Sequence, residues 1–383
     1  MTACIQFKFM VEKSIGKGED SDPILFSTES SAITGVYDGM GGSGASLCTS
    51  GYEGQHTKAY VASRIIRDAI DDYVSNQGTN INSEALKRIC VERLNREITS
   101  YPSPKSMLKS KLIRNYPTTF TLAVANYKNA NIIIDSYWAG DSRNYLWIDG
   151  GFYQITKDDL VNDYDPLDNL TSDSALSNCV CADNDFTINH KEIKIDKQPY
   201  VILSATDGCF GYCRTPMHFE HLLASSLYSS NNQEDWERRM KEQIQEISGD
   251  DFSIAIIAKG FKDFSELKRL LGKKSTQYVE EITVQQQRIE DLHKELNESE
   301  AALQRTIELS WNNYKSSYCK YIDDDSRDYY NEETSDIGKK TPPSHRCFGK
   351  LCLSLSKRIK WLTRRFTRIH IRMRLNNKKH NKR

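Results

Sequence analysis

Four aspartates lie at the ends of apolar, strand-like segments, and each has a glycine beside it. They are Asp38 in VYDGMGG, Asp141 in WAGDSRNYL, Asp207 in LSATDGCF and Asp250 in SGDDFSIAII. Glycine lets the backbone turn sharply and approach a bound ion closely. Carboxylates at separate strand ends can converge on one cleft, where Mg²⁺ and Mn²⁺ find the oxygen ligands that they favour.

Such a cluster predicts hydrolysis assisted by two metal ions. Two ions about 4 Å apart can share a carboxylate, lower the pKa of a bridging water and neutralise charge in an in-line phosphoryl displacement. An Asp-Gly pair by itself is usually a turn. The prediction therefore depends on the ordered set of four aspartates, and not on Asp38 alone.

Strands and amphipathic helices must position these residues. Short β-rich runs predict strands at 33–37, 119–126, 131–138, 144–148, 200–206 and 251–258, and the last two are apolar enough to be buried on both faces. Apolar residues at helical spacing predict helices at 57–74, 83–99, 217–228 and 233–247. This order predicts sheets packed between layers of helices, and it does not fit a repeating βαβ unit.

The ordered segments resemble the PPM, or PP2C-type, serine/threonine phosphatase family. The resemblance covers residues 13–258, about two-thirds of the chain, and its most specific parts are DGMGG and GDSR. The segments in family order are KSIGKGEDSD, VYDGMGG, FTLAVA after a TT pair, WAGDSRNYLW, ITKDD, LSATDGCF and GDDFSIAII. The resemblance implies an α+β fold, a four-layer α-β-β-α sandwich of two antiparallel sheets flanked by helices and followed by a C-terminal helical extension.

The resemblance also implies roles for single residues. Asp38 should bridge two Mn²⁺ or Mg²⁺ ions, and the Gly39 carbonyl should reach one of them. Asp207 and Asp250 should complete the other site, which makes Asp38, Asp207 and Asp250 the expected catalytic aspartates. The remaining expected ligands are Asp141 for a third ion, and Glu19 and Asp20, which hold metal-bound water or support the site.

Three positions depart from the family pattern. Met40 stands where eukaryotic relatives have a histidine that can act as general acid, which resembles the bacterial branch. The phosphate-gripping arginine before the early acidic pair is missing, and Lys13 and Lys17 are the basic residues there. A lysine supplies a point charge but not a bidentate fork. In DDFS, Asp250 aligns with the ligand, while Asp251 could compete for the role.

The sequence divides into four parts: a phosphatase-like domain over 1–260, a long helix or short coiled coil over 261–320, an acidic flexible linker over 321–343 and a basic amphipathic tail over 344–383. Ile282, Ile289, Leu296 and Leu303 recur every seven residues, which is typical of a coiled-coil seam. A single helix over 264–315 is expected. A coiled coil and an exposed helix folded back onto the body both stay open.

The tail separates charge from the rest of the chain. Residues 344–383 contain 14 Lys and Arg and no Asp or Glu, so the remainder carries a charge of −14, because the whole chain is neutral. A basic amphipathic helix favours contact with an anionic membrane surface or an acidic partner. Nucleic acid is a weaker expectation because aromatic residues are sparse, and docking on the acidic body is the alternative.

The ten cysteines show no paired CxxC spacing, and no secretory signal or spanning segment is recognisable. We therefore expect reduced thiols in a cytoplasmic protein, peripheral at a membrane if the tail binds one. The expected activity is protein-serine/threonine phosphatase, with phosphorylated proteins as substrates. The alternative is a pseudophosphatase that binds phosphopeptides or regulates a partner.

Overall fold

The computed structural model describes residues 4–102, 114–128, 130–162, 165–171, 174–183, 185–272 and 277–321. The chain divides into two units, residues 1–292 and 293–383. The first unit contains two five-stranded sheets in which every neighbouring pair of strands is antiparallel. The predictions for the linker and the tail, from residue 322 onward, lie outside the described residues.

The strand orders define the two sheets. The first sheet has the order β1 (Ile5–Val11), β12 (Phe252–Lys259), β11 (Tyr200–Ala205), β8 (Arg143–Ile148) and β9 (Gly151–Gln154). The second sheet has the order β10 (Asn189–Asp196), β7 (Asn131–Ala139), β6 (Thr118–Lys128), β3 (Ser31–Gly39) and β2 (Ser21–Ser27). A separate ribbon pairs β4 (Leu47–Cys48) with β5 (His56–Thr57).

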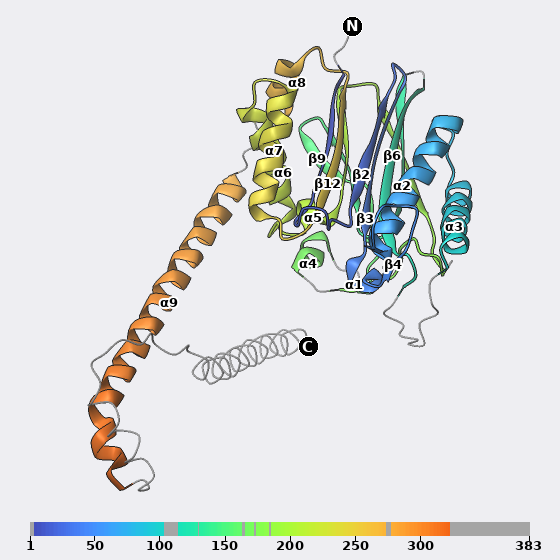
Figure 1. Cartoon of the computed structure of the whole chain (residues 1–383). Coiled ribbons are helices and arrows are strands. Elements are labelled where there is room, and N and C mark those ends of the chain that lie inside the picture. Colours follow the sequence, from blue (N-terminus) through green and yellow to red (C-terminus); the bar gives the residue numbers. More distant parts are fainter. Residues whose placement is uncertain are drawn as a thin grey trace, which may run out of the picture. The chain divides into compact units, whose positions relative to one another are not determined.

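Helices cover the outer face of each sheet (Figure 1). The first sheet packs against α6 (Pro216–Ser229), α7 (Gln233–Ile247) and α8 (Phe264–Leu271), and the second against α2 (Lys58–Gln77) and α3 (Ser83–Ser100). Three short helices, α1 (Gly41–Gly44), α4 (Pro166–Thr171) and α5 (Asp207–Phe210), lie at one end of the sheets. The predicted four-layer α-β-β-α fold is confirmed.

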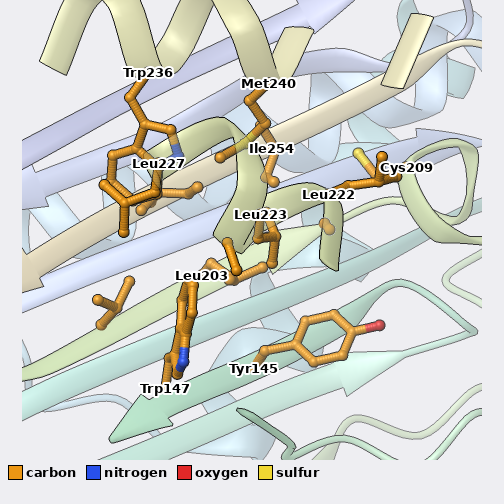
Figure 2. Close-up of a cluster of buried hydrophobic side chains, with 14 of the residues drawn as sticks. Tyr145, Trp147, Leu203, Cys209, Leu222, Leu223, Leu227, Trp236, Met240 and Ile254 are labelled. Atoms are coloured by element: carbon orange, nitrogen blue, oxygen red, sulfur yellow. The ribbon is translucent and has the colours of Figure 1, made fainter. Parts of the chain in front are cut away.

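The apolar pattern of each element explains its position. Figure 2 shows Leu223 of α6 and Trp236 of α7 packed over Leu203 and Ile254 of the first sheet. All eight residues of β12 are buried, because one of its faces meets these helices and the other meets the second sheet. Burying such side chains is the main force that holds the layers together.

A buried chain of hydrogen bonds joins the two sheets. Ser204 on β11 donates to Asn144 Oδ1 on β8 at 2.6 Å, and the Asn144 amide donates to Ser136 on β7 at 2.7 Å. The Thr34 hydroxyl on β3 lies 2.8 Å from the Ser204 hydroxyl. Between apolar layers such bonds have little freedom to rearrange, so they fix the position of one sheet along the other.

The predicted strands, and the four helices predicted between residues 57 and 247, are all present, with boundaries shifted by at most a few residues. The sequence analysis missed β1, β2, β9 and β10. The edge strand β10 reads NHKEIKID and is mostly exposed, so it has no apolar run that would reveal it. Its partner β7 supplies the pairing instead.

The prediction of one helix over 264–315 is wrong. The structure has α8 and a separate α9 (Gln277–Tyr318). Leu267 and Leu271 of α8 are buried in the core of the first unit, and a Cβ on Gly272 would lie 2.7 Å from the Lys268 carbonyl oxygen. Gly272 is the C-cap of α8, and its backbone N–H donates to the Lys268 carbonyl at 2.9 Å.

Most described apolar residues of α9 are exposed, with Leu296 at 54% and Leu303 at 60%, whereas Ile282 is half-buried. Their heptad spacing still predicts a coiled coil. In the described part of the chain, no helix has the length and apolar character to cross a membrane.

We expect Ser204→Ala to lower the free energy of unfolding by about 1–3 kcal/mol, because it leaves Thr34 and Asn144 with unpaired buried polar atoms. Urea unfolding followed by circular dichroism measures this change. Ser229→Ala, an exposed serine at the end of α6, is the control. Equal stability of the two variants would contradict the bridging role.

Candidate metal centre

Asp20, Asp141 and Asp207 all lie within electrostatic reach of Asp38. The short helices α1 and α5, which follow Asp38 and begin at Asp207, lie at one end of the sheets (Figure 1). Asp38 ends β3 next to Gly39, and Asp207 begins α5 directly after β11. Asp38 lies within hydrogen-bonding reach of both Asp20 and Asp207. Both sheets therefore contribute carboxylates to one cluster.

Asp20 is buried, Asp38, Asp141 and Asp207 are half-buried, and the four carboxyls lie close enough to repel one another. Burial raises the pKa of Asp38 well above its usual range, and the charges of Asp207, Asp20 and Asp141 raise it further. Burial and the charge of Asp207 raise the pKa of Asp141 to about 8. Burial raises the pKa of Asp20 to about 7, despite hydrogen bonds from Ser253 and Thr206. Without a cation the cluster holds protons, since like charges in a low dielectric cannot all ionise.

Glycines after Asp38 allow the early acidic loop to approach. A Cβ on Gly39 would lie 2.6 Å from the Glu19 carbonyl oxygen and 2.7 Å from the Ala59 carbonyl oxygen. A Cβ on Gly41 would overlap the Glu19 carboxylate. The segment DGMGG therefore needs glycine at both positions so that Glu19 can lie against the turn after β3.

The first turns of α2 hold Glu19 in place. Thr57 donates to the Glu19 carboxylate at 2.5 Å, and Ser63 donates to the Glu19 carbonyl at 2.6 Å. The Arg64 guanidinium donates to the Gly18 carbonyl at 3.3 Å, and its charge lowers the pKa of Glu19, which burial raises. The sequence analysis missed Arg64, because no local motif distinguishes it from other charged residues on a helix.

Asp250 and Asp251 have different environments. The Asp251 carboxylate accepts hydrogen bonds from the backbone N–H groups of Lys13 and Glu19, each at 2.7 Å. Asp250 is exposed, and its charge raises the pKa of Asp207 and of Glu19. Asp251 thus anchors the loop that carries Glu19, while Asp250 is the carboxylate left to face Asp207.

A buried ion pair supports the Asp141 loop. Arg143 donates to both carboxylate oxygens of Asp158, at 2.9 and 2.5 Å, and its guanidinium lies 4.1 Å from the centroid of the Phe210 ring. Asp159 accepts from the Gly140 backbone N–H at 2.9 Å. Asp158 and Asp159 belong to the ITKDD segment, and the sequence analysis did not predict that they support the Asp141 loop.

Lys13 and Lys17 lie on the exposed loop after β1. Their side chains are exposed, and only the backbone of Lys13 is tied to the centre, through Asp251. Met40 is partly buried and packs against the core between the second sheet and its helices. Arg64 also reaches the acidic loop, where its guanidinium donates to the backbone carbonyls of Gly18 and Glu19.

The donor set fits a hard divalent cation. All members of the cluster offer carboxylate oxygens, and a cation would replace the protons that the cluster otherwise holds. Among the residues that the structure describes, no three Asp, Glu, His or Cys side chains form a preassembled ligand group. Mg²⁺ requires no such group, since it binds through one or two carboxylates and keeps several waters.

No family model matches the chain, and no curated protein matches it. Among solved structures, the serine/threonine phosphatase PstP/Ppp of Mycobacterium tuberculosis is 16% identical, with a TM-score of 0.46, over 67% of this chain and 99% of that chain. Serine/threonine phosphatase Stp1 of Staphylococcus aureus is 15% identical, with a TM-score of 0.45, over 68% and 95%. A bacterial serine phosphatase is 17% identical, with a TM-score of 0.47, over 68% and 100%.

The metal-free protein should lose stability as pH rises. Asp20 and Asp141 have a pKa of about 7 and about 8 in the folded protein, against an ordinary value of 3.8. Between about pH 4 and pH 8 the folded state keeps these protons, whereas the unfolded chain has lost them. Their contribution to the free energy of unfolding is therefore full below about pH 4 and is lost as the pH rises toward 8. In EDTA, the melting temperature should fall as the pH rises from 5 to 8. Added Mn²⁺ should raise the melting temperature more at pH 8 than at pH 5.

Asp141→Asn is the control for this effect, because it removes one titrating group. The pH dependence of the variant in EDTA should be smaller than that of the wild type. A pH dependence that is unchanged by the substitution would contradict the assignment.

Asp250→Ala and Asp251→Ala should separate two roles. Asp251→Ala should lower the free energy of unfolding by about 1–3 kcal/mol, because the Lys13 and Glu19 N–H groups lose their acceptor. Asp250→Ala should leave stability nearly unchanged, since the residue is exposed, and should weaken Mn²⁺ binding about 10- to 100-fold. Urea unfolding and calorimetric Mn²⁺ titration measure the two effects. If Asp250→Ala lowered stability and Asp251→Ala weakened Mn²⁺ binding, Asp250 would be the loop anchor and Asp251 the metal ligand.

Proposed function

We propose that this chain is a metal-dependent phosphatase that hydrolyses phosphoserine or phosphothreonine on proteins. The observation that carries the proposal is the gathering of Asp38, Asp141 and Asp207 with Asp20 at one end of the two sheets. When bound, two Mn²⁺ or Mg²⁺ ions would lower the pKa of a water and neutralise phosphoryl charge. The PPM-like order of motifs agrees with this reaction.

Asp38 is the proposed bridging ligand, since it alone lies within hydrogen-bonding reach of both Asp20 and Asp207 among the described interactions of the cluster. The Gly39 carbonyl is the proposed backbone ligand beside it. Asp207 and Asp250 complete the second position, and the charge of Asp250 raises the pKa of Asp207. A fixed carboxylate frame orients the reacting groups before the substrate arrives, which lowers the reorganisation required during the reaction.

Glu19, Asp20 and Asp141 have proposed supporting roles. Glu19 and Asp20 hold water and ligands in position at the edge of the centre, and Asp141 would bind a third ion. Lys13 and Lys17 lie on the loop anchored by Asp251 and would attract the substrate phosphate. They do so as exposed point charges, and they replace an arginine fork only in part.

We expect Asp38→Ala to reduce Mn²⁺-dependent hydrolysis of p-nitrophenyl phosphate by more than about 100-fold, which exceeds the usual cost of losing a partner outside the ligand shell. Asp196→Ala is the matched control. Asp196 is exposed and ends β10, where it pairs with Asn131 at the start of β7. Asp141 follows the opposite end of β7, so Asp196 lies at the end of the sheet away from the candidate centre. The control should retain wild-type turnover.

Wild-type protein that shows no turnover with either Mn²⁺ or Mg²⁺ would refute the enzymatic proposal. In that case, tight binding of phosphopeptides by the same protein would favour the pseudophosphatase alternative. Assaying both properties on one preparation separates the two functions.

A further inference from the structure

Two cavities lie next to each other beside the candidate centre. The larger, about 220 Å³, is acidic and includes Asp141, Asp158 and Asp207 in its lining. The smaller, about 150 Å³, has an aromatic lining that includes Phe152 and Phe219. The functional assignment made so far uses the acidic cavity and leaves the aromatic one without a role.

The two cavities share part of their walls. Arg143, Leu170 and Phe210 line both of them. Because they share these wall residues, the two cavities adjoin, and a substrate bound at the acidic cavity brings its neighbouring residues close to the aromatic one. An extended peptide advances about 3.3 Å per residue, so a side chain within about three residues of the phosphorylated one can reach the aromatic cavity.

The aromatic cavity suits an uncharged ring. Tyr145 stacks on Phe152 at 4.8 Å, and Phe210 and Phe219 complete the aromatic wall, with ring centroids 6.0 Å apart. An apolar cavity of about 150 Å³ is large enough to hold benzene. The Arg143 guanidinium already covers the Phe210 ring and carries positive charge, which disfavours a cationic ligand.

We propose that this cavity is a specificity pocket for an aromatic side chain of the phosphoprotein substrate. The side chain would lie within about three residues of the phosphorylated serine or threonine. This inference rests on the proposed phosphatase function. It adds that the substrates carry an aromatic residue near the phosphorylation site, and that Leu170 and the aromatic wall select them.

Short phosphothreonine peptides test the pocket. One series places a single phenylalanine at each position from three before to three after the phosphothreonine, and the reference peptide has alanine throughout. We expect the best phenylalanine peptide to exceed the alanine peptide in kcat/KM by about 10-fold or more, the factor expected when a side chain of this size leaves water.

Two tryptophan variants on α4 locate the effect. Leu170→Trp fills the aromatic cavity and should bring the phenylalanine-to-alanine ratio close to one. Leu167→Trp is the matched control, because Leu167 is 43% exposed and is not among the residues lining either cavity. Leu170→Ala provides a second test in case Leu170→Trp does not fold. Because it enlarges the cavity, the peptide with the highest kcat/KM should change from the phenylalanine peptide to one with tryptophan at the same position.

A ratio of one in the wild type, or a ratio that Leu170→Trp leaves unchanged, would overturn the pocket while p-nitrophenyl phosphate hydrolysis still supports the phosphatase. If that hydrolysis is absent, the proposed function fails, and fluorescence anisotropy with the same labelled peptides decides the pocket. Stronger binding of phenylalanine than alanine peptides then supports it, and equal binding overturns it.

A metal-free measurement provides an independent readout. Xenon binds apolar cavities of this size, so crystals of the full chain under xenon pressure should show the atom in the cavity that Phe152, Leu170 and Phe219 line. Xenon should be absent from this position in Leu170→Trp. A wild-type crystal without xenon there would overturn the apolar character of the cavity.

Discussion

The mutual repulsion of buried carboxylates is the constraint on which the rest of this structure depends. Asp38, Asp141 and Asp207 come from three different strand ends. The charges of Asp207 and Asp141 raise the pKa of Asp38, and the charge of Asp207 raises the pKa of Asp141. Such an arrangement is unfavourable in a low dielectric unless protons or cations neutralise it. The surrounding fold must therefore hold the carboxylates together against their charge.

Three devices in the fold provide this restraint. The hydrogen-bond chain through Ser204 and Asn144 fixes the two sheets relative to each other, a few residues before β3 and β11 deliver their aspartates. Asp251 anchors the Glu19 loop, and Arg143 ties the Asp141 loop to Asp158. Each device uses charged or polar groups whose partners lie far away in sequence, so the centre is assembled from distant parts of the chain.

Elements with strong local signals were predictable. β11 and β12 are buried on both faces and read as continuous apolar runs, and α7 begins and ends at its predicted residues. Elements that depend on partners were not predictable. β10 is an exposed edge strand stabilised by pairing with β7, and α8 is a separate short helix that ends at its Gly272 cap and packs Leu267 and Leu271 into the core.

The sequence by itself determined which residue types could bind a hard metal and in what order they follow the strands, because glycine and carboxylate beside an apolar run form a local pattern. Only the tertiary structure decided which of Asp250 and Asp251 anchors a loop, since both carry the same charge and differ only in their neighbours. The aromatic cavity beside Arg143 likewise exists only once β8, α4 and α6 meet. Local patterns fix chemistry, whereas long-range packing assigns each group its partner.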